Sequence, residues 1–366
     1  MRIKFLVPQL SQPRCIKRIQ ALQNAGYDAE VYGFDNGLYS DNIKDIRGVI
    51  HSFKIDKKLS RKESVKAKLA CVRQLCKSLE KDDIVYIFGI ELALIYRVFL
   101  KRNKVIYEQA DLNYTKLPKK WLVNIFKAID KWLIAKSSIT VLTSQGFIDY
   151  LYGENARVDN KIILLPNKLH KDLLCFPKMT SKDKMINLEK IRFGFVGAIR
   201  YPRTLFCFAR TVAEKYTQHE FHFYGTGICS KEAEDLSKRY SNIFYHGAFR
   251  NPIDLQSVYS NIDINIVCYD PASLNVRIAE PNKLYESIYF NLPIVVSKGT
   301  FLEKRVKEFK VGFSIDCTDE NCICKFIEGL NIDELDCMKK AMDLVNSSSL
   351  IDDENLLIYR VRKLLK

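Results

Sequence analysis

The densest set of reactive side chains lies in AEPNKLYESIYFNLPIVVS, residues 279–297, where a Pro-Asn pair opens a helical pattern. Asn282 and Glu286 are four residues apart and therefore share one helix face. Amides at a helix start lack internal partners and attract phosphate, and Lys283 adds a point charge. Glu286 can accept hydrogen bonds from a ribose diol, and Glu280 can accept from a sugar hydroxyl. The stretch predicts a site for a phosphorylated sugar. The open alternative is a helix capped by Asn282 with a Lys283–Glu286 pair.

A second group of cations stands in GFVGAIRYPRTL, residues 194–205. Gly197 ends an apolar run there, and Arg200 and Arg203 precede the next helical pattern. Two forked guanidinium groups beside a glycine turn suit a diphosphate. The GxGxxG fingerprint of dinucleotide sites is missing, so solvated arginines are the open alternative. Gly225 follows the next expected strand in the same way.

Other common catalytic patterns are missing from the sequence. There is no GxSxG, HExxH or GxxxxGK[ST] motif. The eleven cysteines include no CxxC pair, and the five histidines show no ligand spacing beyond His219 and His222 at a strand start. We therefore expect reduced thiols and no metal site. With no secretory signal visible, the expected location is the cytoplasm.

The elements that must position these groups alternate along the chain. Apolar runs in the first half are separated by helical patterns at about residues 14–26, 60–79, 91–102 and 119–138. After residue 190 the alternation restarts and continues through the stretch that opens at Ala279. Short buried strands separated by helices are typical of parallel, doubly wound sheets. The prediction is an α/β fold with two Rossmann-like domains facing across a cleft, and ligands bind beyond the carboxyl ends of such strands.

Domain boundaries follow from where the alternation stops. We expect an N-terminal acceptor-binding domain over 1–168, a polar linker over 169–190 and a C-terminal nucleotide-sugar-binding domain over 191–350. The last segment, 351–366, reads as a basic amphipathic helix that can pack back on the N-terminal domain.

The net charge of +15 is concentrated in the first half of the chain. A basic surface suits nucleic acid, anionic membrane or phosphate-bearing substrates, or it serves solubility alone. The stretch from Lys119 to Ser138 places Trp121 and Trp132 among lysines on an amphipathic helix, which can dock on anionic lipid. The alternative is that its apolar stripe belongs to the core. Residues 84–100 are apolar but contain two charges, so a strand followed by a helix is expected rather than a membrane span.

The segment EPNKLYESIYFNLPIVVS resembles the donor-binding segment of bacterial GT-B glycosyltransferases of the GT4-like type. FGFVGAIR, FHFYGTG and NIFYHGAF resemble successive strands of that family's second domain. LLPN and VIYEQADL resemble the end and the central strand of its first domain. The resemblance covers most of the chain and implies the GT-B fold.

The resemblance implies transfer of a sugar from a UDP- or GDP-sugar to a lipid-linked or polysaccharide acceptor in cell-surface polysaccharide synthesis. It implies no cofactor, no metal and retention of anomeric configuration. The implied donor-binding residues are Gly197, Arg200, Arg203, Gly225, Phe249, Asn282, Lys283, Leu284 and Glu286. The implied catalytic residues are Glu280 and Asp111. The basic first half and the amphipathic helix with Trp121 and Trp132 add the expectation of a place at the inner face of a membrane, with an anionic surface as a further partner.

The sequence also departs from the family pattern. Ala110 stands where a histidine often precedes the aspartate, and Asn291 stands where glycine is usual. Five residues rather than seven separate Glu280 from Glu286. A GT-B-like scaffold without catalysis is therefore one alternative. A basic polyanion-binding protein is another, although no nucleic-acid motif supports nucleic acid as a partner.

Overall fold

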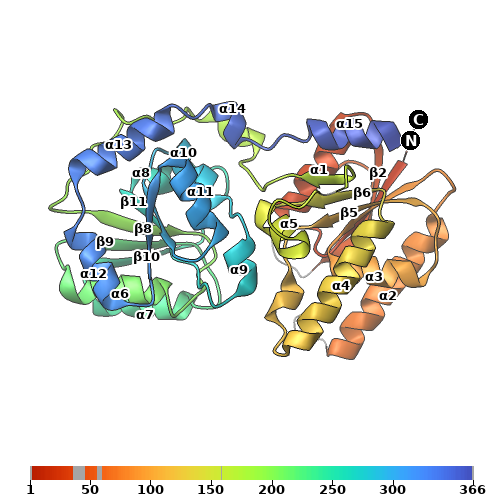
Figure 1. The fold of residues 1–366 in the computed structure, drawn as a ribbon, viewed down its shortest axis with the longest axis horizontal. Coiled ribbons are helices and arrows are strands. Elements are labelled where there is room, and N and C mark those ends of the chain that lie inside the picture. The colour runs from red at the N-terminus through yellow and green to blue at the C-terminus, as the bar shows by residue number, and fades with distance from the viewer. Residues whose placement is uncertain (1, 36–45, 56–59, 158, 365–366) are drawn as a thin grey trace. The chain divides into compact units, whose positions relative to one another are not determined.

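The computed structural model describes residues 2–35, 46–55, 60–157 and 159–364 of the chain. The chain forms two compact units (Figure 1). Unit 1 comprises Met1–Pro166 together with Asp353–Lys366, and unit 2 comprises Asn167–Asp352. Two short segments, 56–59 in the basic first half and 365–366 in the expected C-terminal helix, lie outside the described residues.

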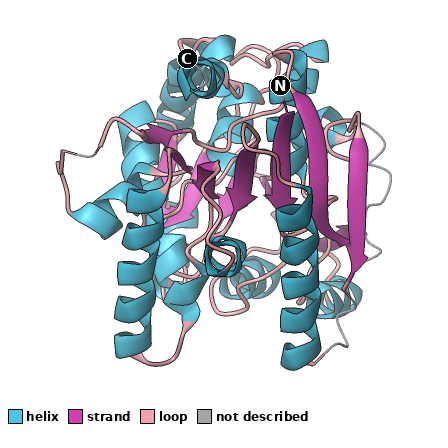
Figure 2. Ribbon diagram, turned by 90° about the vertical axis from the view of Figure 1, so that its right-hand side faces the viewer, coloured by secondary structure: helices cyan, strands magenta, loops and turns pink. Residues whose placement is uncertain are grey.

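Unit 1 contains a parallel sheet which, in the described residues, has the order β3-β2-β1-β4-β5-β6-β7. The order reverses between β1 and β4, which is the switch point where doubly wound folds bind ligands. Figure 2 shows the strands of this unit between helices. The strands are β1 (Arg2–Val7), β2 (Asp28–Asp35), β3 (Val49–Lys54), β4 (Ile84–Phe88), β5 (Lys104–Gln109), β6 (Ile139–Leu142) and β7 (Ile162–Leu164). The helices are α1 (Pro13–Asn24), α2 (Arg61–Ser78), α3 (Ile90–Val98), η2 (Asn113–Lys116), α4 (Lys120–Lys136), α5 (Gln145–Tyr152) and α15 (Asn355–Leu364).

Unit 2 repeats this plan with the strand order β10-β9-β8-β11-β12-β13 in its described residues. Its strands are β8 (Arg192–Val196), β9 (Glu220–Tyr224), β10 (Ile243–Gly247), β11 (Ile264–Val267), β12 (Ile294–Ser297) and β13 (Gly312–Ile315). Its helices are η3 (Lys171–Cys175), α6 (Leu205–Lys215), α7 (Ser230–Arg239), α8 (Leu255–Ser260), α9 (Leu274–Ile278), α10 (Lys283–Tyr289), α11 (Phe301–Phe309), α12 (Glu320–Glu328), α13 (Ile332–Asp343) and α14 (Ser347–Leu350). The strand order reverses between β8 and β11, so the carboxyl ends of these two strands are where a doubly wound unit typically binds its ligand.

Burial on both faces explains why the strands are continuously apolar. In β4, Tyr86 and Phe88 enter the core on one face of the sheet, while Val85 and Ile87 enter the core on the other. The predicted α/β fold with two doubly wound sheets is confirmed. The apolar run over 84–100 is β4 followed by α3, as expected. Among the described residues, none of the helices combines the length and the apolar character that a bilayer span requires.

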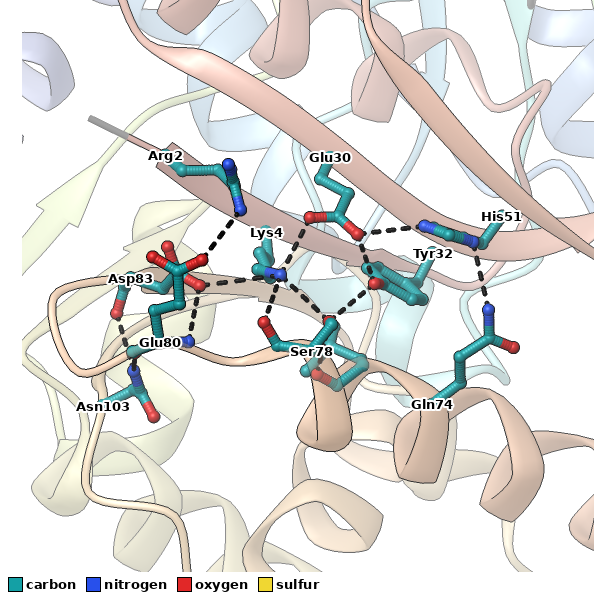
Figure 3. Close-up of polar contacts among 11 residues, drawn as sticks. Arg2, Lys4, Glu30, Tyr32, His51, Gln74, Ser78, Glu80, Asp83 and Asn103 are labelled. Atoms are coloured by element: carbon teal, nitrogen blue, oxygen red, sulfur yellow. Dashed lines mark hydrogen bonds and ion pairs between the residues drawn. The ribbon is translucent and has the colours of Figure 1, made fainter.

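A buried polar network fastens the end of α2 to the sheet of unit 1 (Figure 3). Lys4 is 1% exposed, and its Nζ lies 2.8 Å from Glu30 and 2.7 Å from the carbonyl oxygen of Ser78. Burial alone raises the pKa of Glu30, but hydrogen bonds from Lys4, Tyr32 and His51 outweigh it and hold the pKa at about 2. The cation and its partners are mutually compensated, so this network serves structure.

The structure shows what the C-terminal helix and residues 169–190 pack against, which the sequence did not determine. Helix α15 belongs to unit 1, where Leu357 and Val361 are fully buried in its core. Glu354, just before α15, lies 2.9 Å from Arg18 of α1. Residues 169–190, expected to be a linker, contain η3 and belong to unit 2, whose core includes Leu173.

Candidate functional site

Three neighbouring strands of unit 2 end in glycines with positive φ, and backbone crowding explains one of them. A Cβ atom on Gly225 would lie 1.9 Å from the carbonyl oxygen of Gly197, so no other residue fits there. Gly197 (φ +140°) is different, because the nearest atom to a Cβ built on it is the Cε atom of Lys283, at 3.4 Å. The glycine loop after β8 therefore lies beside a lysine side chain from α10. Backbone without a side chain next to a cation is an arrangement that suits a bound phosphate.

Lys283 is held in place by a buried carboxylate. Its side chain is 8% exposed and forms an ion pair with Glu286, three residues later on α10. The Nζ atom also lies 3.5 Å from the hydroxyl of Tyr259, which comes from α8. The pair compensates two charges that would otherwise be costly to bury.

Glu286 is 1% exposed, and both of its carboxylate oxygens have partners. The Nδ2 group of Asn282 donates to Oε1 at 2.6 Å, while Tyr259 and Lys283 donate to Oε2. Burial and the charge of Glu286 raise the pKa of Tyr259 well above its usual range, so this hydroxyl stays protonated and donates. We call Asn282, Lys283, Glu286 and Tyr259 the α10 cluster.

The alternative that the sequence left open is therefore observed in part. Lys283 and Glu286 do pair, but the side chain of Asn282 makes no capping hydrogen bond to α10. It contacts Glu286 instead, so the three polar residues form one unit around a buried charge pair. Tyr259 is a member that sequence reasoning missed, because it lies 24 residues before Lys283 and only the packing of α8 on α10 brings it close.

Glu280 lies apart from this pair, in a different set of contacts. It is 7% exposed, and its Oε1 atom accepts a hydrogen bond from Tyr285 at 2.6 Å. Arg305 of α11 contacts the same oxygen at 3.1 Å. The sequence carried no signal for Arg305, because the strand before α11 separates it from the motif. Glu280 is thus a paired carboxylate at the start of the segment that leads into α10.

The arginines of the loop after β8 reach solvent. Arg200 and Arg203 are both exposed, and Arg203 lies 3.8 Å from Asp270, a distance too long for a strong pair. The loop itself is fixed, since Ile199 is fully buried and its amide donates to Thr226 at 3.1 Å. Two exposed cations thus extend from a loop that begins at Gly197 and is held by backbone hydrogen bonds.

The remaining predicted donor residues differ in what they can offer. Leu284 is fully buried in the core of unit 2, so its side chain packs and only its backbone can meet a ligand. Phe249 is half-buried, packs against the same core and follows β10.

Asp111, the predicted catalytic acid of unit 1, is exposed and follows β5. Its carbonyl oxygen accepts from Asn113 at 2.9 Å at the start of η2. Helix η2, which follows Asp111, is held in place through Asp130 of α4. Nothing in the sequence indicated that Asp130 takes part. Asp130 is fully buried and accepts hydrogen bonds from Tyr107 at 2.7 Å and Tyr114 of η2 at 3.1 Å. Burial raises the pKa of Asp130 to about 6.

Comparison with known proteins supports the architecture. No protein-family model matches the chain, and no curated protein matches its sequence. Among solved structures, the chain is similar to HepE of Anabaena in complex with UDP and glucose, with a TM-score of 0.70, 12% identity and coverage of 100% of this chain and 99% of that one.

Sucrose-phosphate synthase from Thermosynechococcus elongatus is similar with a TM-score of 0.71 and 12% identity, over 100% of this chain and 98% of that one. The lipopolysaccharide outer core galactosyltransferase WaaB in its apo form is similar with a TM-score of 0.61 and 14% identity, over 99% and 98%. These neighbours are GT-B glycosyltransferases and match the chain from end to end. The chain therefore has the GT-B fold, with two Rossmann-like units.

Proposed function

We propose that the protein is a glycosyltransferase that moves a sugar from a nucleotide-sugar, a UDP- or GDP-sugar, to a glycan or lipid-linked acceptor. The observation that carries the proposal is the buried Lys283–Glu286 pair, whose lysine lies beside Gly197 at the carboxyl end of β8. Ligands of doubly wound units bind at such strand ends. HepE, which shares the fold, has been solved with UDP and with UDP-glucose.

The cations of unit 2 hold the donor diphosphate in this proposal. Lys283 supplies a positioned charge beside Gly197, and the exposed guanidinium groups of Arg200 and Arg203 close on the phosphates from the loop. Together they stabilise the negative charge that develops as the diphosphate leaves, a contribution usually among the largest in catalysis. This charge stabilisation comes from side chains, so the proposed reaction is metal-independent.

The rest of the donor is bound by groups around the α10 cluster. Glu286 accepts from the ribose diol once the donor enters, giving up one of its present hydrogen-bond partners. The nucleobase lies near Gly225 and Phe249, which follow β9 and β10. Glu280 accepts from a hydroxyl of the transferred sugar, with Arg305 holding its carboxylate in place.

The transfer step is proposed to retain configuration at the anomeric carbon. The bond from that carbon to the diphosphate oxygen breaks while the acceptor oxygen forms its bond on the same face. The acceptor proton passes to the departing diphosphate oxygen. Asp111 orients the acceptor hydroxyl from the loop after β5.

The proposal is tested by a thermal-shift screen of nucleoside diphosphates and nucleotide-sugars, followed by assays for released UDP or GDP. A ligand at 100 times its Kd stabilises a protein by about 2.7 kcal/mol, which is readily measured. The expected result is stabilisation by one base and loss of that stabilisation in Lys283→Ala, with Lys304→Ala, an exposed lysine of the same unit, as the control. Absence of any nucleotide effect would refute the proposal. Binding without release of nucleotide from any donor and acceptor pair would assign the chain to a non-catalytic GT-B scaffold.

A further inference from the structure

Both tryptophans of the chain lie exposed on one helix. Trp121 is 57% exposed and Trp132 is 45% exposed, and Ile125 between them is 46% exposed. At 3.6 residues per turn, these three positions fall within about 40° of one another around α4. We call Trp121, Ile125, Ala128 and Trp132 the α4 stripe. The stripe lies on the surface, whereas Leu133 and Ile134 of the same helix are buried in the core of unit 1, so α4 has both a core face and an exposed apolar stripe.

The accessible charge of this helix is entirely positive. Five lysines lie on α4 or immediately before it, whereas the one acid of α4, Asp130, is fully buried. Two of the lysines are steadied by aromatic rings of α5, with Lys127 Nζ 4.2 Å from the ring centre of Tyr150 and Lys131 Nζ 5.0 Å from that of Tyr152. An apolar stripe flanked by cations therefore faces solvent.

The helices that pack beside α4 continue the same character. Arg97 of α3 donates to the carbonyl oxygen of Lys136 at 2.7 Å, and α2, α3 and α4 form one layer of unit 1 (Figure 1). Val98 of α3 is 71% exposed. Helix α2 adds further exposed cations, namely Lys62, Lys66, Arg73 and Lys77. The layer as a whole is basic with scattered apolar side chains.

We propose that the α4 stripe docks this protein on an anionic lipid bilayer. Tryptophans at the headgroup level combined with lysines that meet lipid phosphates are the usual chemistry of an interfacial helix. A second copy of the chain fits less well, since it would bring two sets of lysines together. Nucleic acid would be held by the lysines alone and leaves Ile125 without a role.

Docking also has a consequence for the loop that carries Asp111. The buried face of α4 holds Tyr114 of η2 through Asp130, and η2 begins two residues after Asp111. A docked α4 therefore fixes the loop with Asp111 relative to the bilayer surface. Docking itself does not depend on the proposed function. Only the role given to the Asp111 loop rests on it, because that role makes the acceptor a lipid-linked glycan.

Because both tryptophans belong to the stripe, tryptophan emission, excited selectively over that of the 19 tyrosines, reports on the stripe alone. The experiment adds vesicles of neutral phosphatidylcholine, or the same vesicles with about one-third anionic phosphatidylglycerol, to the protein without donor. The expected result is a blue shift of emission and co-sedimentation with anionic vesicles, both reduced by salt. Quenching by brominated lipid distinguishes insertion of the rings from adsorption by charge.

Matched variants assign the effect to α4. Trp121→Ala/Trp132→Ala is expected to weaken co-sedimentation roughly tenfold or more, since apolar burial contributes to interfacial binding. Lys120→Ser/Lys131→Ser is expected to weaken it about 25-fold, at about fivefold for each lysine. The controls remove exposed side chains of unit 2: Met185→Ala/Leu344→Ala for the apolar pair and Lys304→Ser/Lys340→Ser for the charged pair.

Unchanged emission with anionic vesicles, or equal binding by the variants and their controls, would overturn the proposal. So would tryptophan-dependent dimerisation without vesicles, which would assign the stripe to a second copy, or an equal blue shift on adding heparin or RNA. Donor binding by the α4 variants, measured by calorimetry without lipid, is expected to match that of the unaltered chain. That measurement separates failure of docking from failure of the proposed transfer.

Discussion

Asp130 of unit 1 and Glu286 of unit 2 are both completely buried carboxylates, yet their partners differ in charge. Asp130 receives hydrogen bonds from neutral groups, chiefly Tyr107 and Tyr114, and burial raises its pKa to about 6. Glu286 has one tyrosine and one amide, and it also has Lys283. The comparison suggests two uses for a buried acid: Asp130, with neutral partners, anchors the structure, whereas Glu286 retains a cation beside a strand end, which in the proposed function is the place for an anionic ligand.

The largest effect is expected from replacing Lys283, the cation that pairs with Glu286. Lys283→Met leaves Glu286 buried without its counter-charge and should lower the free energy of unfolding by about 3–5 kcal/mol. Adding Glu286→Gln removes the stranded charge and should restore most of the stability, while affinity for the nucleotide donor stays low. Urea unfolding and calorimetry on the single and double variants measure both quantities, with Lys304→Met as control. Full donor affinity in Lys283→Met would make the pair a structural anchor like Asp130.

The next largest effect concerns Asp130, whose hydrogen-bond partners are all neutral. The pKa of Asp130 is raised in the folded state from 3.8 to about 6, so the folded protein binds a proton more tightly than the unfolded chain. Its contribution to stability is complete below pH 4 and is lost as the pH rises from about 4 to about 6. Asp130→Asn should therefore be more stable than the unaltered chain at pH 7, by up to about 3 kcal/mol at about 1.4 kcal/mol per pKa unit.

Melting curves between pH 4 and pH 7 check this prediction. The difference between Asp130→Asn and the unaltered chain should grow with pH, since Tyr107, Tyr114, Tyr150 and Tyr152 stay neutral throughout this range. Asp82→Asn, an exposed aspartate of the same unit, serves as the control and should show no such trend. A pH-independent difference would mean that the lost hydrogen bonds, rather than the buried charge, decide the effect.

A smaller effect is expected from the exposed cations of unit 2. Arg200→Ala and Arg203→Ala should each weaken donor binding by roughly 1.5–3 kcal/mol, the range for hydrogen bonds to charged groups. Both side chains are exposed, so the melting temperature should stay almost unchanged. The contrast with Lys283→Met, which alters binding and stability together, sharpens the distinction between a buried, paired cation and exposed ones. Unaltered affinity in both variants would remove these arginines from the site.

The smallest effect is expected at Asp270, which lies 3.8 Å from Arg203. Asp270→Asn should change stability by less than about 0.5 kcal/mol, because the pair is long and Arg203 is exposed, and an asparagine oxygen can still accept from the amide of Ala272. Donor affinity should stay the same or rise slightly, since the carboxylate of Asp270 no longer competes with phosphate for Arg203. Weaker donor binding in this variant would show that Asp270 positions Arg203 for the ligand.

Much of the fold could be read from the sequence, because local burial produces a local pattern. The run IVYIF is apolar since both faces of β4 are covered, and the break at Gly89 separates it from α3. Strand β3 escaped notice because its residues Val49–Lys54, at the edge of the sheet, are all half-buried or exposed, so they form no buried apolar run. Helix α11 escaped notice as well, and with it Arg305, the partner of Glu280.

The sequence by itself determined which residues can pair along one helix. Asn282, Lys283 and Glu286 lie within one helical turn, so their contacts follow from backbone periodicity alone. It also determined that α4 has an apolar stripe among lysines. These are properties of a single element and need no knowledge of what packs against it.

Only the tertiary structure decided which faces are covered and which distant residues meet. The packing of α8 on α10 brings Tyr259 to Glu286, and the parallel order of the sheet places Gly197 beside Lys283. Packing likewise buries Asp130 and leaves Trp121 and Trp132 in solvent, although all three lie on one helix. The physical reason is that burial and the meeting of charges depend on contacts between elements far apart in the chain, which the spacing of residues along it does not encode.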